Sequence, residues 1–179
     1  SVPAHYTRNG RTRRSGQLDH ASLHVLLPDF SPWRKDRAEA FLDTGTLSNL
    51  LTINIRAAAS EMPEERVFNA IYRPYIDGSG DVTDEGLQSF AFRAGSPYGK
   101  KQIFRGLKTG SAAERQRPPL FICDIIKHEN PNCESRFNLG TSAQVSYNFK
   151  RIHLAQWEAI DRDVREMIRS FRAAARRQN

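Results

Sequence analysis

The sequence lacks any apolar run that approaches the roughly eighteen residues of a membrane-spanning helix. It also lacks a phosphate-binding glycine loop, because Gly99-Lys100-Lys101 has no upstream glycine at P-loop spacing. The five histidines form no His-x-x-x-His pair, and no Gly-x-Ser-x-Gly nucleophile elbow occurs. These absences argue against the common metal-dependent, nucleotide-binding and serine-hydrolase classes. We expect no catalytic residues, no metal and no cofactor.

Two short motifs resemble functional sites but are incomplete. Residues 77–85 combine glycine and acids as an EF-hand loop does, but the first and last ligand positions hold tyrosine and glycine. The triplet Asp43-Thr-Gly matches that of aspartic proteases, without the strand pattern that surrounds it in that class. We therefore predict an acidic turn at 77–85 and an ordinary turn after Asp43.

Acidic residues are in the minority: the chain has 20 Asp and Glu and 27 Lys and Arg, which gives a net charge of +7. Such a surplus favours acidic partners, whether nucleic acid, an anionic membrane or an acidic protein surface. Much of it lies in arginines near the two ends, which we interpret as solvated tails. No RRM, KH or zinc-finger signature is present, so no nucleic-acid partner is expected. We predict a flexible basic lead-in over 1–19 and a single α+β domain over 20–179.

The sequence has only two cysteines, Cys123 and Cys133, with an Asn-Pro-Asn turn between them. An even count across a turn favours a disulfide-stapled hairpin, which persists only in an oxidising compartment. A turn centred near Asn130 would place Phe137 opposite Cys123, so the bridge would need an off-centre turn or a bulge. The alternative is two buried free thiols in a cytosolic protein. Zinc is not favoured, because the cysteines and His128 lack paired ligand spacing.

Alternating and periodic apolar residues predict an α+β fold. Strand patterns occur at 22–27, 47–58, 67–75, 87–93, 102–105, 120–126, 133–139 and 143–149. Ser31-Pro32 predicts the start of one short N-terminal helix that continues to about residue 42. The most regular pattern is a helix over 153–175. Its apolar stripe is the predicted core: Leu154, Trp157, Ile160, Val164, Ile168 and Phe171. We expect an antiparallel sheet packed against this long C-terminal helix.

The segment 120–171 has a recognisable order of motifs. A cysteine strand leads to Asn-Pro-Asn-Cys133, then to a strand ending Val-Ser-Tyr-Asn-Phe149, then to a helix that begins with Gln-Trp157-Glu-Ala-Ile. This order resembles the C-terminal portion of periplasmic immunity proteins that neutralise type VI secretion effectors, including the lipase-immunity type. The resemblance lies mainly in core positions and therefore concerns the fold and the setting more than a contact surface.

The resemblance implies a stoichiometric inhibitor, not an enzyme, that binds and neutralises a cognate secreted toxin in the periplasm. It also implies export by a signal peptide, often a lipoprotein one. The chain begins at Ser1 with no initiator methionine and no such segment, so we expect either that it is a piece of a longer protein or that a targeting segment has been removed. Membrane attachment is expected only if an N-terminal lipid anchor was removed with it. The basic surplus predicts an acidic toxin surface and a salt-sensitive association rate.

The predicted contact surface consists of the acidic turn at 77–85 and the long loop at 106–119. Its candidate partner-binding residues are Asp77, Asp81, Asp84, Lys108, Arg115 and Arg117. Two alternative functions stay open: a basic nucleic-acid-binding or small nuclease or toxin domain inside the cell, and an envelope adaptor protein. Free thiols in the native protein would favour the first alternative. Recovery in a fixed assembly that contains no effector would favour the second.

Overall fold

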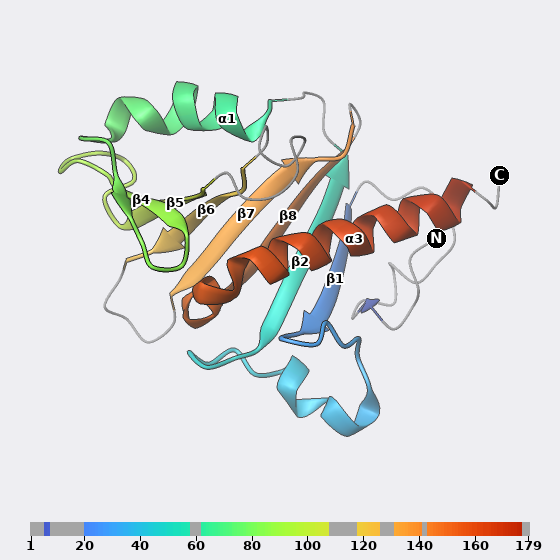
Figure 1. Cartoon of the computed structure of the whole chain (residues 1–179). Coiled ribbons are helices and arrows are strands. Elements are labelled where there is room, and N and C mark those ends of the chain that lie inside the picture. The colour runs from blue at the N-terminus through green and yellow to red at the C-terminus, as the bar shows by residue number, and fades with distance from the viewer. Residues whose placement is uncertain are drawn as a thin grey trace.

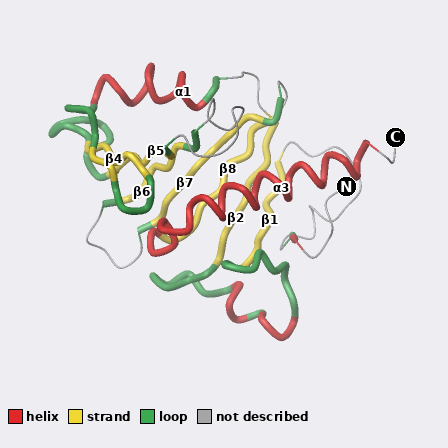
Figure 2. The backbone as a smooth tube through the Cα atoms, in the orientation of Figure 1, coloured by secondary structure: helices red, strands yellow, loops and turns green. Residues whose placement is uncertain are grey.

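One antiparallel sheet and one long helix make up most of the molecule (Figures 1 and 2). The computed structural model describes residues 6–7, 20–57, 62–107, 118–125, 131–140 and 143–176. Its strands are β1 His20–Leu26, β2 Leu50–Ala57, β3 Asp81–Val82, β4 Leu87–Ala91, β5 Lys101–Gly106, β6 Leu120–Asp124, β7 Asn132–Asn138 and β8 Ala143–Lys150. Its α-helices are α1 Glu64–Val67 and α3 Trp157–Arg176. Shorter helical turns are η3 Lys35–Arg37, η4 Glu39–Phe41, η5 Phe68–Tyr72, η6 Arg73–Tyr75 and η7 Arg151–Gln156.

All eight strands join in one sheet, in the order β1-β2-β8-β7-β6-β5-β4-β3. Each neighbouring pair is antiparallel. The 20-residue helix α3 crosses one face of the sheet, over β7, β8, β2 and β1 (Figure 1). The predicted fold class, an α+β protein with an antiparallel sheet under a long C-terminal helix, is confirmed.

The main core lies between α3 and the sheet. Alternate residues of each strand point towards the helix, as in Leu51 and Ile53 of β2, both of which are 0% exposed. From the predicted stripe, four residues of α3 are buried against them: Trp157, Ile160, Val164 and Ile168. Leu154 and Phe171 pack at the margin and are partly buried.

A second core lies on the opposite face of the sheet, over β4, β5 and β6 only. Phe68, Tyr72 and Ile76 cover it there. In β5, Ile103 faces this cluster while its neighbour Phe104 faces the α3 core. Strands β4 to β6 are thus covered on both faces. The described elements cover β1, β2, β8 and β7 on the α3 side and reach their other face only where residues 62–72 border β7 and the start of β8.

The predicted strand over 67–75 is wrong, because this segment is helical. Its β-branched and aromatic residues favour a strand, but Phe68, Tyr72 and Ile76 recur every four residues and bury one side of a helix. The short N-terminal helix appears as two single 3₁₀ turns, η3 and η4. The two-residue strand β3 was not predicted.

The predicted cysteine register is also wrong. Cys123 and Cys133 are directly paired across β6 and β7, and their sulfurs are joined at 1.99 Å. The midpoint of the paired positions is residue 128 and not 130, so the bridge needs no bulge. Both cysteines are fully buried in the core beneath α3. The disulfide itself is present as predicted.

Candidate functional site

The predicted acidic turn lies at the β3–β4 end of the sheet. The side chains of Asp77, Asp81 and Asp84 are all exposed. A carboxylate oxygen of Asp77 lies 3.7 Å from Nε of Arg93, a weak surface ion pair. The other three predicted contacts, Lys108, Arg115 and Arg117, lie outside the described residues. Of the six predicted contact residues, the structure therefore places the three acids alone, beside one another in the chain around β3.

A different surface stands out on the side of the sheet that faces away from α3. Outward-pointing residues of β1, β2, β8 and β7 lie opposite one another and form polar rows. The rows are His24, Thr52, Asn148 and Glu134; Ser22, Asn54, Ser146 and Arg136; and Arg56, Gln144 and Asn138. Together with Lys150 at the end of β8, we call this surface the polar face. Every one of its residues is partly or fully exposed.

Hydrogen bonds between strands tie many side chains of the polar face together. The Ser22 hydroxyl donates to Oδ1 of Asn54 at 2.7 Å, and Arg56 donates to Oε1 of Gln144 at 2.5 and 3.1 Å. Gln144 in turn donates to Oδ1 of Asn138 at 3.3 Å. These bonds restrain the orientation of the side chains that they join.

The charge on the polar face is mainly positive. Its single acid, Glu134, accepts a hydrogen bond from Arg136 at 3.0 Å, which leaves Arg56 and Lys150 as further cations. Partial burial lowers the pKa of Lys150, and the nearby carboxylate of Asp43 acts in the opposite direction. A carboxylate arriving at this face would thus meet both cations and neutral hydrogen-bond donors.

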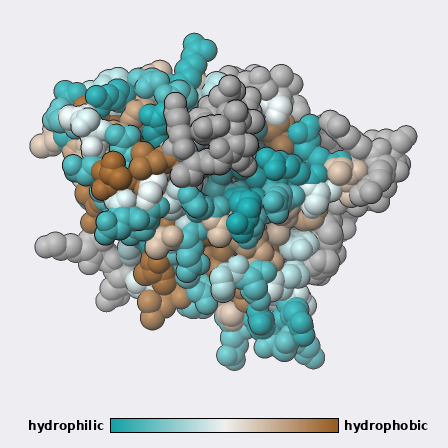
Figure 3. Space-filling view, viewed as in Figure 1, coloured by the Kyte–Doolittle hydropathy of each residue, from teal (hydrophilic) through white to brown (hydrophobic). Residues whose placement is uncertain are grey.

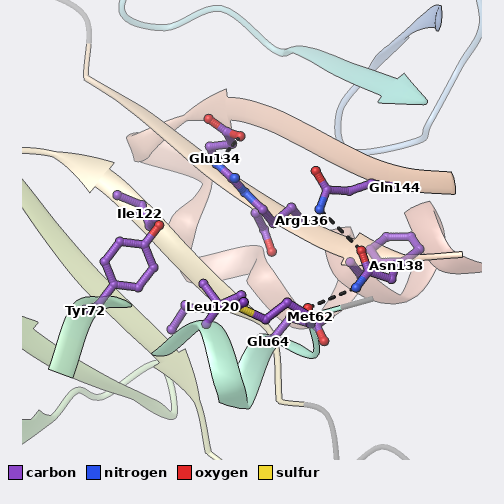
Figure 4. Close-up of a pocket in the computed structure, with 12 residues that line it drawn as sticks. Met62, Glu64, Tyr72, Leu120, Ile122, Glu134, Arg136, Asn138 and Gln144 are labelled. Carbon is purple, nitrogen blue, oxygen red and sulfur yellow. Dashed lines mark hydrogen bonds and ion pairs between the residues drawn. The ribbon is translucent and has the colours of Figure 1, made fainter. Parts of the chain in front are cut away.

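A narrow cleft borders the polar face where α1 meets β7 (Figure 4). Tyr72 and Met62 line it from the helical side, and Glu134, Arg136 and Gln144 line it from the sheet. It encloses about 20 Å³, which is room for about one water molecule. The Asn138 amide closes one end by donating to the Met62 carbonyl at 2.9 Å. The cleft is too small for a substrate as it stands.

A buried polar network crosses the core beneath this cleft. The Tyr147 hydroxyl donates to Oδ1 of Asp161 at 2.7 Å, and Nε of Arg165 donates to Oδ2 at 2.8 Å. The Arg165 guanidinium stacks 4.2 Å from the Phe137 ring centroid and extends to within 3.5 Å of Oε1 of Glu64. The network links α1, α3 and the sheet.

Burial dominates the electrostatics of this network. It raises the pKa of Glu64, and it raises the pKa of Tyr147 well above its usual value, helped by the charge of Asp161. For Arg165, burial alone would lower the pKa, but Asp161 reverses that effect and the net shift is upwards. The carboxylates of Glu64 and Asp161 both face Arg165 and are largely shielded from solvent. The geometry of the network therefore suits the packing of α1 and α3 against the sheet.

The sequence carries one signal for this network. Asp161 lies four residues after Trp157 and three before Val164, on the apolar stripe itself. An acid at such a position, four residues before Arg165, indicates a buried pair. Glu64 gave no comparable signal, because its segment was not predicted to be helical.

Two further surface features lie away from the polar face. A groove of about 400 Å³ runs between the end of β1 and η3–η4, and the chain after η4 exposes Leu42 and Leu47 at 68% and 75%. Figure 3 shows mostly hydrophilic residues on the outward side of α3, with hydrophobic atoms gathered beside β4–β5 and near the start of α3. These are secondary candidates for contact.

Other kinds of site have no support in the described part of the chain. No described helix has both the length and the apolar character required to cross a membrane. Among the described residues, no three His, Cys, Asp or Glu side chains gather as metal ligands would.

Comparison with known proteins identifies a shared fold. No protein-family model matches the sequence, and no curated protein matches it. Among solved structures, the chain is similar to Smlt3025, described as an immunity protein of the Stenotrophomonas maltophilia type IV secretion system. The TM-score is 0.59 at 16% identity, over 93% of this chain and 86% of that chain. The two proteins share a fold along nearly their whole lengths.

Proposed function

We propose that this chain is an immunity protein that binds a cognate toxin, delivered by a bacterial secretion system, and neutralises it by stoichiometric inhibition. The observation that carries the proposal is the fold shared with a secretion-system immunity protein over 93% of the chain. The sequence resemblance over 120–171 supports the same class by a separate route. Inhibition of this kind requires a contact surface and no catalytic residues.

The proposed compartment is the periplasm. The buried disulfide between Cys123 and Cys133 supports it, because such bonds form and persist in oxidising compartments. For the delivery route we propose type VI secretion, which the sequence resemblance implies. The structural neighbour belongs to a type IV system, so a type IV effector is the competing outcome of the test.

Growth protection tests the proposal. The secreted proteins encoded by the genes that flank this chain's gene are each expressed in a sensitive host, with export directed to the periplasm, and the one that stops growth is taken as the neighbouring effector. Co-expression of this protein with an export signal should restore growth, and the same protein without the signal should not. Protection by the cytoplasmic form alone would refute the periplasmic setting. Lack of both binding and protection would refute the immunity function.

A further inference from the structure

We infer that the polar face of β1, β2, β8 and β7 is the surface that docks the toxin, and that its partner is a carboxylate-rich protein surface. The inference rests on the proposed function and adds to it a location and a chemistry of recognition. It differs from the sequence prediction, which placed the contacts at the acidic turn 77–85 and the loop 106–119.

The fold leaves part of one face of the sheet open. Helix α3 covers one face of the sheet, and α1 and η5 cover the other face over β4 to β6. Among the described elements, only residues 62–72 reach the outer face of β1, β2, β8 and β7, where they border the cleft at β7 and the start of β8. A solvated face is ordinary in an antiparallel sheet, so the chemistry of the exposed side chains must decide its use.

The charge of the polar face complements an acidic partner. The side chains of Arg56 and Lys150 add positive charge, and Glu134, the face's only acid, is paired with Arg136 on the same strand. Between these cations lie hydroxyl and amide groups, including Asn54 and Ser146, which donate and accept hydrogen bonds. A surface of Asp and Glu carboxylates would satisfy both the charges and the donors.

The polar face has the size and the stiffness expected at the centre of a protein interface. Four strands about 4.8 Å apart and about seven residues long span roughly 19 by 24 Å, which suits the centre of an interface of about 800 Å² per partner. The hydrogen bonds from Ser22 to Asn54 and from Arg56 to Gln144 order the side chains before binding. Such preorganisation reduces the entropy lost on association.

The same residues disfavour nucleic acid as the occupant. Binding to a duplex draws on phosphate contacts from Lys and Arg, and binding to a single strand draws on aromatic side chains that stack with the bases. The polar face supplies Arg56, Arg136 and Lys150 as its cations. None of its rows contains Phe, Tyr or Trp.

The test compares matched substitutions on the two sides of the molecule. One variant, Arg56→Glu with Lys150→Glu, reverses two charges on the polar face. Its control, Arg169→Glu with Arg172→Glu, reverses two exposed arginines on the outward side of α3. A second pair, Ser146→Trp and Ser170→Trp, adds bulk at the centre of the polar face and on α3. Thermal melts establish that each variant is folded.

Binding is measured against the purified effector encoded by the neighbouring gene. The polar-face variants should weaken binding at least about tenfold for each reversed charge, and Ser146→Trp should weaken it similarly. The α3 controls should stay within about threefold of the original protein. The association rate of the original protein should fall with added salt, and the charge-reversed variant should lose that dependence.

Several results would overturn the inference. If the original protein binds the effector and the folded polar-face variants bind equally well, the toxin docks elsewhere and the proposed function stands. If the original protein does not bind, the proposed function fails and the inference fails with it. If the original protein self-associates or binds duplex DNA, and only the polar-face variants lose that property, the surface belongs to that partner instead.

Discussion

Breaking the Cys123–Cys133 disulfide should cost about 2.7 kcal/mol of folding free energy. The two cysteines are ten residues apart in sequence, and the chain-entropy model gives that figure for a loop of about this length. At about 2.1 cal/mol/K of unfolding entropy per residue, a chain of 179 residues should lose about 7 °C in Tm. The strand register would be unchanged, because Phe121 and Ser135 continue the pairing without the bond.

The assay is urea unfolding of the oxidised protein and of protein refolded in a thiol-free reductant. Reduction must precede refolding, because both cysteines are fully buried. The variant Cys123→Ala with Cys133→Ala should lose more than the reduced protein, since it also removes two sulfurs from the core. Equal stability of the oxidised and reduced forms would refute the reasoning. Two free thiols in freshly purified, denatured protein would remove the argument for an oxidising compartment.

Three other predictions concern packing and the buried network. Ile160→Ala should lower the free energy of unfolding by about 2–5 kcal/mol, because the Ile160 side chain is 1% exposed. Ile152→Ala is the control: its side chain is 47% exposed, and the free energy of unfolding in the same denaturant assay should change by less than about 1 kcal/mol. Tyr147→Phe should cost about 1.5–3 kcal/mol by removing the hydrogen bond to the Asp161 carboxylate, with no change in effector affinity. For Glu64, burial raises the pKa in the folded state, so its contribution to stability is greatest in acid and is lost as pH rises through that pKa. Unfolding series across pH should show that Glu64→Gln lacks this loss, and identical pH profiles for the two proteins would contradict the argument.

The sequence predicted those parts of the fold where a period is sustained. The 3.6-residue stripe from Leu154 to Phe171 identified α3, and strict alternation identified β2, β7 and β8. The strand prediction for 67–75 was wrong because the residue types in this segment favour strands. Its apolar residues recur every four positions, as in a helix, and these are the residues that pack on the sheet. The predicted helix begins at residue 153, before the observed start of α3 at Trp157, because the 3₁₀ turns of η7 continue the apolar pattern in the preceding residues.

The candidate surface was less predictable than the fold. Thr52, Asn54 and Arg56 were visible as the polar half of an alternating strand, but their neighbours in the sheet were not. Only the register places Asn54 beside Ser22 and Ser146, on strands far apart in the sequence. A surface built from long-range pairing has no local motif, so the sequence alone does not predict it.

The most direct test of the central claim is a titration of the neighbouring effector's own activity with this protein. The proposed function predicts that activity falls in proportion to added protein and is abolished near one equivalent, with a one-to-one complex recovered by size exclusion. Full activity in the presence of a large excess of the folded, oxidised protein, with no complex recovered, would contradict it.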